Sequence, residues 1–186
     1  SDNEEKYADY KISTIKNVVD YWYKTNILDK GYDNKIADTG YCNDMSKKST
    51  IFFGSQDRLW NNKVPTLKCP NKERDLLSKS NNKLTYPVGL LTWDEAFFAG
   101  GGFYMGDELY YPSYYLITGR WYWTMTPAYW NGSTLFVGDV RSHGTMFYSD
   151  VSGSSIGIGV RPVLSLKPNV IVTSGDGTEN NPYIIK

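Results

Sequence analysis

The stretch that decides the fold is residues 121–150, WYWTMTPAYWNGSTLFVGDVRSHGTMFYSD. It consists of short runs rich in aromatic and β-branched residues, and the dipeptides Asn-Gly and His-Gly that separate them are typical of tight turns. Working outward from it, we predict strands over 121–126, 134–140, 145–150 and 159–166, and shorter ones over 170–173 and 183–185. The C-terminal half is therefore predicted to be a compact set of short strands.

The front half carries helical signals instead. Apolar residues spaced i, i+3, i+4 predict an amphipathic helix over about 11–25, with an inner face of Ile12, Ile15, Val19 and Trp22. Thr92 with Glu95 three residues later is a capping box, and the glycines at 100–102 end a second helix over 93–99. Further strands are predicted over 51–53 and 84–91. Two helices followed by many strands give an α+β fold class.

The totals indicate one domain spanning 1–186, with a polar segment over 1–9 that we expect to be frayed. The chain has 186 residues, 20 Lys+Arg and 20 Asp+Glu, so its formal net charge is zero. This balance argues against a nucleic-acid partner and against electrostatic docking on membranes. No apolar run approaches the ~18 residues that span a bilayer, so membrane attachment would need a missing anchor segment. The polar start suits either a cytosolic chain or a domain excised from a longer exported protein.

Aromatic content is the unusual feature of the composition, at 16% with 16 Tyr and 6 Trp. Such rings have a flat apolar face and a polar tip, so they serve recognition surfaces as well as Tyr-rich cores and sheets. Trp22, Trp93 and Trp123 lie in regular elements and are expected in the core. The rings in predicted loops are surface candidates: Tyr110, Tyr111, Tyr114, Tyr115, Tyr129 and Trp130. A flat ring can stack on a sugar or a peptide, so a glycan or a protein is the expected ligand.

The chain has two cysteines, Cys42 and Cys69, and one histidine, His143. Zinc usually requires four ligands, so this inventory predicts no metal site, and nothing in it indicates a cofactor. The cysteines themselves leave two alternatives open. They form a disulfide, as pairs in exported chains do, or they are two unrelated buried thiols.

Catalytic patterns are weak, and we expect no enzyme and no catalytic residues. Residues 153–157 match Gly-x-Ser-x-Gly with Ser155 as nucleophile, but a strand rather than a helix is predicted to follow and His143 precedes the serine. Four carboxylates could suggest a glycosidase pair: Asp94, Glu95, Asp107 and Glu108. The first two are better explained as N-terminal helix residues that suit the helix dipole. A carboxylate-based hydrolase remains the alternative, and Arg161 is expected to be structural.

Several motifs together resemble an uncharacterised class of exported proteins, mostly from gut Firmicutes. They are Tyr-Trp-Thr at 122–124, Pro127, Gly-Val-Arg-Pro-Val at 159–163, Gly-Asp-Gly-Thr at 175–178 and Asn-Asn-Pro-Tyr at 180–183. The combination is specific although no single motif is, and similar segments cover nearly the whole chain. The resemblance implies an extracellular or cell-surface location, which favours the disulfide between Cys42 and Cys69.

The Gly-Val-Arg-Pro strand is also similar to the ending of the C-type-lectin-like fold of formylglycine-generating enzymes and of the variable proteins of diversity-generating retroelements. That fold implies two helices packed on short twisted antiparallel strands with long irregular loops. It implies a binding surface formed by Tyr129, Trp130, Asn131, Ser133, Asp139, Arg141, His143 and Tyr148.

This chain departs from both characterised groups. No cysteine follows Cys69, so the cysteine chemistry of formylglycine-generating enzymes is not carried over, and the motifs of calcium-dependent lectins are absent. The turn at 176–180 offers oxygen ligands but too few acids for a calcium loop. We therefore expect a non-catalytic module for carbohydrate binding or adhesion, or else a structural domain of a surface protein.

Overall fold

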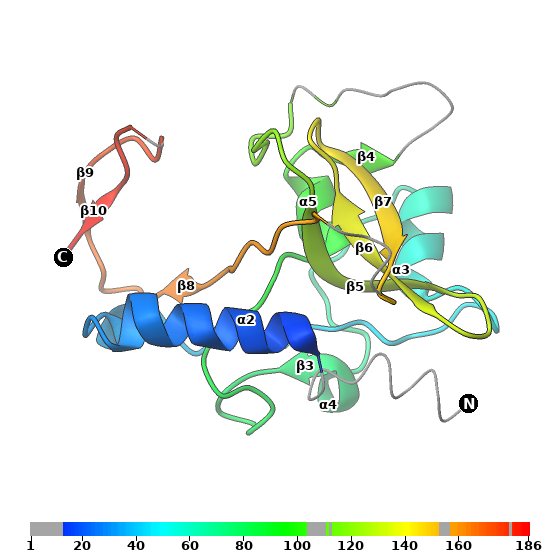
Figure 1. Cartoon of the computed structure of the whole chain (residues 1–186), viewed down its shortest axis with the longest axis horizontal. Coiled ribbons are helices and arrows are strands. Elements are labelled where there is room, and N and C mark those ends of the chain that lie inside the picture. The colour runs from blue at the N-terminus through cyan, green and yellow to red at the C-terminus, as the bar shows by residue number, and fades with distance from the viewer. Residues whose placement is uncertain (1–12, 104–110, 112, 153–156, 179) are drawn as a thin grey trace.

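The structure is a computed structural model that describes residues 13–103, 111, 113–152, 157–178 and 180–186. The predicted frayed segment 1–9 lies outside them, as does Ile12. The described chain is α+β, as predicted, with four short α-helices and several small sheets (Figure 1). The helices are α2 (Thr14–Tyr23), α3 (Gly54–Gln56), α4 (Lys72–Asp75) and α5 (Trp93–Phe98).

The largest sheet has four strands in the order β4-β7-β6-β5. Strands β5 (Tyr122–Trp130), β6 (Leu135–Val140) and β7 (Thr145–Asp150) form an antiparallel meander, which confirms the strands predicted over the deciding stretch. Strand β5 is longer than predicted and its register with β6 shifts twice around Pro127. Strand β4 (Gly102–Phe103) pairs in parallel with the start of β7, so the expectation of a purely antiparallel sheet was wrong at this edge.

Helices α5 and α2 cover opposite faces of this sheet because side chains alternate along β5. Tyr122 packs in one cluster with Trp93 of α5, and Trp123 packs in another with Val19 of α2. The α5 side is the tighter of the two, since a Cβ on Gly138 would come within 2.4 Å of the Trp93 indole. The two predicted helices thus pack on the strands as expected, one on each face.

Both predicted helices form, with local signals that explain their ends. Ser13 caps α2, its side chain accepts from the Lys16 amide, and the helix continues as a π-helical segment, η2 (Lys24–Leu28). In α5 the capping box is confirmed, because the Thr92 hydroxyl accepts from the Glu95 amide while Glu95 accepts from the Thr92 amide. The short helices α3 and α4 were not predicted. Among the described residues, no helix is both long and apolar enough to cross a membrane.

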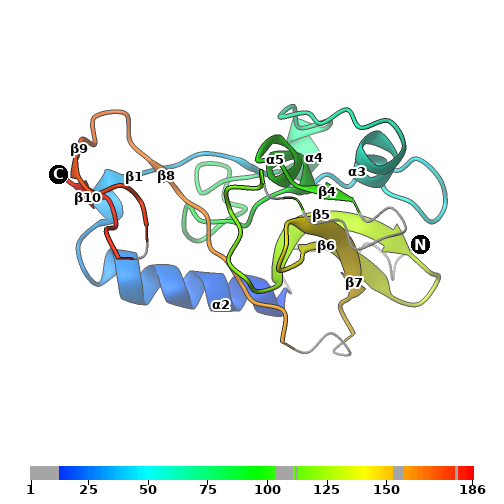
Figure 2. The same ribbon diagram turned by 90° about the horizontal axis from the view of Figure 1, so that it is seen from above.

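The remaining pairings are two or three residues long. They are β1 (Ile36–Ala37) with β8 (Ser165–Leu166), β2 (Tyr41–Cys42) with β3 (Leu76–Leu77), and β9 (Val172–Ser174) with β10 (Ile184–Ile185). The predicted strands over 51–53, 84–91 and most of 159–166 were wrong, because these segments make only isolated bridges. Pro87 and Pro162 lack the amide hydrogen that a ladder needs, which limits pairing there. The β9–β10 hairpin lies at the far end of the molecule from the main sheet (Figure 2).

Candidate functional site

The predicted binding residues are spread along the length of the main sheet. Asn131 and Ser133 lie in the turn that joins β5 to β6, whereas Arg141 and His143 lie in the turn that joins β6 to β7. These turns are at opposite ends of β6, and six strand residues at about 3.3 Å each separate them by roughly 20 Å. A surface that includes both turns would have to extend over that length.

Burial removes two further rings from the predicted surface. Trp130 is 6% exposed and packs with Phe53 and Leu135, because it is the last residue of β5 rather than a loop residue. Tyr114 is buried in the α5 cluster, where its hydroxyl hydrogen-bonds that of Tyr122. Tyr115 is exposed as predicted, Tyr111 is half-buried, and Tyr110 lies outside the described residues.

What the structure does bring together is a series of neighbouring aromatic rings along β5, β6 and β7, which we call the aromatic row. Adjacent centroids among five of its rings are 4.8 to 6.0 Å apart. Most members are half-buried, and Trp121 is 40% exposed. The members are Phe52, Tyr129, Phe136, Tyr148, Phe147 and, joined through Arg141, Trp121.

Strand register explains part of the row. Tyr129 pairs directly with Phe136 across β5 and β6, and Tyr148 stands diagonally from Phe136 across β6 and β7. Such cross-strand aromatic pairs contribute about 0.2–1 kcal/mol each, so the row also stabilises the sheet. Sequence reasoning found Tyr129 and Tyr148 but missed Phe136 and Phe147. The alternation of residues in the predicted strands could have placed Phe136 beside Tyr148.

Arg141 lies between two rings at one end of the row, in an arrangement we call the Arg141 clamp. Its guanidinium carbon is 4.4 Å from the Trp121 ring centroid and 4.4 Å from that of Phe147. The pairing of Trp123, Asp139 and Phe147 across three strands puts their side chains on one face. Trp121 precedes Trp123 by two residues and Arg141 follows Asp139 by two, so both share that face. Cation–π attraction to two rings holds the guanidinium in place.

Asp139 lies beneath the clamp with no exposed surface. The Ser149 hydroxyl donates to its Oδ2 atom at 2.6 Å, while Oδ1 has no hydrogen-bond partner. Oδ1 is 3.8 Å from the Nε atom of Arg141, which is also buried and without a hydrogen-bond partner. That distance is too long for a hydrogen bond. Burial raises the pKa of Asp139, and the Ser149 hydrogen bond and the Arg141 charge oppose it only partly.

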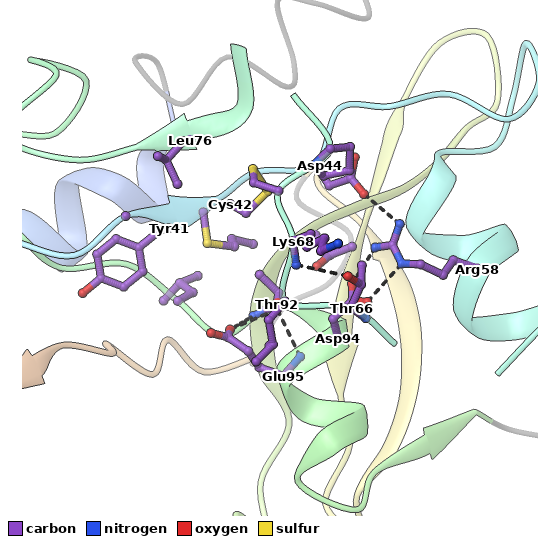
Figure 3. Close-up of a pocket in the computed structure, with 17 residues that line it drawn as sticks. Tyr41, Cys42, Asp44, Arg58, Thr66, Lys68, Leu76, Thr92, Asp94 and Glu95 are labelled. Carbon is purple, nitrogen blue, oxygen red and sulfur yellow. Dashed lines mark hydrogen bonds and ion pairs between the residues drawn. A yellow bond between two sulfur atoms is a disulfide. The ribbon is translucent and has the colours of Figure 1, made fainter. Parts of the chain in front are cut away.

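A separate pocket of about 220 Å³ opens between β2, residues 66–70 and the start of α5 (Figure 3). Arg58, from the π-helical segment η4 (Asp57–Asn61), joins two buried carboxylates there. It donates from Nε and Nη2 to Asp94 at 3.0 and 2.6 Å, and from Nη1 to Asp44 at 3.1 Å. The Thr66 amide also donates to Asp94, at 2.7 Å. Burial alone would lower the pKa of Arg58, but Asp94 and Asp44 more than offset it and the pKa is raised.

The pocket contains two of the carboxylates considered for a hydrolase, Asp94 and Glu95. Asp94 accepts three hydrogen bonds from Arg58 and Thr66, and Glu95 accepts from the amide and hydroxyl of Thr92. Both carboxylates thus hold neighbouring segments together, as expected for residues at the start of a helix. The other two, Asp107 and Glu108, lie outside the described residues.

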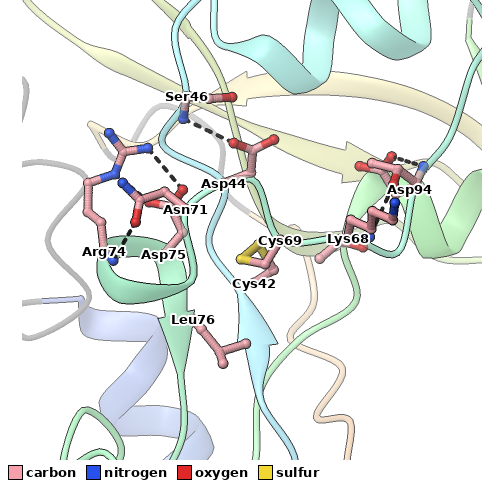
Figure 4. Close-up of a disulfide and its surroundings, with 12 residues drawn as sticks. Cys42, Asp44, Ser46, Lys68, Cys69, Asn71, Arg74, Asp75, Leu76 and Asp94 are labelled. Carbon is pink, nitrogen blue, oxygen red and sulfur yellow. Dashed lines mark hydrogen bonds and ion pairs between the residues drawn. A yellow bond between two sulfur atoms is a disulfide. The ribbon is translucent and has the colours of Figure 1, made fainter.

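The predicted disulfide between Cys42 and Cys69 is present and forms one wall of the pocket (Figure 4). It joins β2 to the segment before α4, over a sequence separation of 27 residues. The closed loop contains Arg58. Next to the disulfide, the Asn43 amide donates to the Asp75 carbonyl, which fixes the start of the loop against α4. The bond thus restrains the element that positions the charged groups of the pocket.

The remaining candidates are only partly described. His143 is exposed in its turn, and Ser155 lies outside the described residues. Arg161 donates to the Leu116 carbonyl at 2.7 Å and lies over the Tyr122 ring, in keeping with the structural role predicted for it. Across the described ranges, no group of three His, Cys, Asp or Glu side chains could hold a metal ion.

Comparisons of the chain with protein-family models, with curated proteins and with solved structures give no match. The likeness to exported Firmicutes proteins and to the C-type-lectin-like fold therefore stays an expectation. Functional inference rests on the geometry of the described residues.

Proposed function

We propose that this chain is a non-catalytic ligand-binding module of the cell surface or extracellular space, which binds glycans through the aromatic row. The single observation that carries the proposal is the row itself: neighbouring half-buried aromatic rings, with the guanidinium of Arg141 over the two rings at one end. Tyr, Trp and Arg are the residues enriched in binding hot spots.

A glycan suits the row better than other ligands do, because the aromatic rings of the row are flat and the row carries few charges. Sugar rings present C–H faces that pack on aromatic faces, and their hydroxyls remain free to hydrogen-bond with water or with nearby Tyr hydroxyls. The members Tyr129 and Tyr148 supply such hydroxyls within the row. A protein ligand is the alternative that the experiment below distinguishes.

Two other features support the location and the fold in this proposal. Disulfides persist in oxidising compartments, and the bond between Cys42 and Cys69 therefore favours an exported protein. Helices α2 and α5 on opposite faces of a short antiparallel meander, with long irregular connections, agree with a C-type-lectin-like fold.

The test is a glycan array probed with the wild type and with variants of the row. Tyr148→Leu and Trp121→Leu keep apolar volume but remove a flat ring, so each should weaken binding about three- to tenfold, as expected for an interaction of about 1 kcal/mol. Isothermal titration with the best glycan gives the dissociation constants.

A matched control is Tyr21→Leu, because Tyr21 is 71% exposed on α2, outside the row. It should bind as the wild type does. Equal weakening by all three substitutions, or no glycan binding by the wild type, would contradict the proposal. Binding to peptides that depends on Tyr148 would assign the row to a protein ligand instead.

A further inference from the structure

We infer that the Arg141 clamp is a carboxylate-binding site, and that the glycan taken by this module is an acidic one such as a uronic or sialic acid. This rests on the proposed function and names its ligand class. The inference depends on three observations: unused donors on the guanidinium, the two aromatic rings beside it, and the unsatisfied atoms beneath it.

The guanidinium of Arg141 has donors to spare. An arginine carries five N–H groups, and none of those on Arg141 donates a hydrogen bond to any residue within the described part of the chain. Its side chain is 32% exposed although Nε is buried, so the polar atoms that face solvent are at the Nη1 and Nη2 end. That end is the edge with which arginine binds carboxylates through two parallel hydrogen bonds.

The two rings limit the approach of a ligand. The guanidinium carbon is 4.4 Å from the centroids of both the Trp121 and the Phe147 rings, so the two rings restrict the directions from which a ligand can reach it. A carboxylate is planar and can accept two parallel hydrogen bonds in the plane of the guanidinium. The small planar anion therefore suits a site that two rings confine.

The carboxylate beneath the clamp lies near the guanidinium but makes no hydrogen bond with it. Asp139 is fully buried, its Oδ1 atom has no hydrogen-bond partner, and it is 3.8 Å from the Nε atom of Arg141. Asp139 therefore lies close to the guanidinium without using any of its hydrogen-bond donors. A buried carboxylate with an unsatisfied oxygen is rare in folded proteins, and each case calls for an explanation. Orientation of a ligand-binding arginine provides one.

The position of the clamp links it to the rest of the row. Phe147 contacts Arg141 on one side and stacks on Tyr148 at 4.8 Å, with an angle of 12° between the ring planes. A sugar whose carboxylate reaches Arg141 can thus place its ring, or the next residue of the glycan, over the neighbouring aromatic rings. One ligand would use both the charge and the stacking surface.

The experiment measures binding to two matched pairs of probes by titration calorimetry. One pair is oligogalacturonate and its methyl ester, and the other is sialyllactose and its methyl ester. Within each pair the sugar rings are kept while the charge of the carboxylate is removed. We expect at least one acidic member to bind about tenfold or more tightly than its neutral partner.

Two variants separate the clamp from diffuse charge. Arg141→Lys keeps the positive charge but loses the planar pair of donors, and it should remove most of the preference for the acidic member, a loss of about tenfold to a hundredfold. Arg120→Gln removes a charge from an exposed side chain next to Trp121 and should leave the preference within about twofold. Thermal unfolding of each variant verifies that it is folded.

The outcomes separate this inference from the proposed function. Equal binding to acidic and neutral members, lost in Tyr148→Leu, would overturn the carboxylate site and keep the glycan-binding role. A preference that Arg120→Gln reduces as much as Arg141→Lys would also overturn it. Absence of binding to any glycan overturns both, and a carboxylate preference shown only toward peptides would replace the sugar by a protein ligand.

Discussion

Two arginines of this chain are held in opposite ways, and the contrast separates scaffold from binding surface. Arg58 lies in the pocket beside the disulfide and donates three hydrogen bonds to two buried carboxylates at 2.6 to 3.1 Å. Arg141 lies between two aromatic rings and is 3.8 Å from a carboxylate that it does not hydrogen-bond. The donors of the first are occupied by the fold, and those of the second are available to a ligand.

The same contrast extends to the surroundings of each arginine. The pocket lies where segments distant in sequence meet, and a disulfide, a capping box and an ion-paired triad hold them together. The clamp lies on a regular meander that needs no such restraint, so its polar groups can serve another purpose. The carboxylate-rich pocket is thus a weaker indication of function here than Arg141, whose guanidinium donors are not used by the fold.

The largest effect is expected from Arg58→Met. It leaves Asp44 and Asp94, both at most 6% exposed, without their counterion, which should lower the free energy of unfolding by about 4 kcal/mol. Urea unfolding followed by tryptophan fluorescence measures it. Arg120→Met, at an exposed arginine, serves as control and should stay within about 0.5 kcal/mol of the wild type. If Arg58→Met changed the free energy of unfolding as little as the control does, the triad of Arg58, Asp44 and Asp94 would not be structural.

Removal of the disulfide should rank second. For a sequence separation of 27 residues, the chain-entropy model gives about 3.5 kcal/mol of stability that Cys42→Ser with Cys69→Ser would lose. Reduction of the wild type should lower the unfolding midpoint similarly. Glycan binding by the row should persist below the new midpoint, since the row lies on the meander. Loss of binding in the folded variant would show that the two regions are not independent.

The sequence predicted the meander and the two longer helices because their signals are local. Alternation, the turn dipeptides and the box formed by Thr92 and Glu95 each act within a few residues, and the structure has the corresponding elements. The segments over 84–91 and 159–166 have strand-like composition as well, yet they make only isolated bridges or two-residue strands. Their pairing depends on distant partners and on prolines, which composition does not reveal.

The candidate site was predicted in pieces. Tyr129, Arg141 and Tyr148 were named because the resemblance to the C-type-lectin-like fold implied them, and they do lie along one row. Trp130 was predicted to be a loop ring because the strand was predicted to end at 126, whereas β5 continues to Trp130 with shifts of register around Pro127. The clamp needed Trp121 and Phe147, whose meeting depends on the register of three strands and could not be read from spacing alone.

Asp139 offers the third test, through the pH dependence of stability. Burial raises its pKa above the ordinary 3.8, so the folded protein keeps this proton to higher pH than the unfolded chain does. Its contribution to stability is therefore complete below 3.8 and is lost as pH rises through the folded-state pKa. Asp139→Asn cannot titrate. As pH rises through that window, the free energy of unfolding of the variant should increase relative to that of the wild type, by up to about 1.4 kcal/mol per pH unit.

Urea titrations from about pH 2 to pH 7 measure this difference between variant and wild type, because both carboxyl groups require points below 3.8. Asp57→Asn is the control of opposite sign, because a hydrogen bond from Asn61 lowers the pKa of Asp57 and its contribution is lost as pH falls. If the difference in free energy of unfolding between Asp139→Asn and the wild type stayed constant with pH, burial would not raise the pKa of Asp139.

The smallest effect is expected for the direct coupling between Arg141 and Asp139. This coupling gives the most direct comparison between the Arg141 and Arg58 sites. A double-mutant cycle of Arg141→Met and Asp139→Asn should give a coupling energy below about 1 kcal/mol, because no hydrogen bond joins the pair and the charge of Arg141 has the least influence on the pKa of Asp139. The same cycle on Arg58→Met and Asp94→Asn should exceed about 2 kcal/mol, since two hydrogen bonds join that pair. Equal couplings would make Arg141 another scaffold residue and would remove the physical reason for expecting a ligand there.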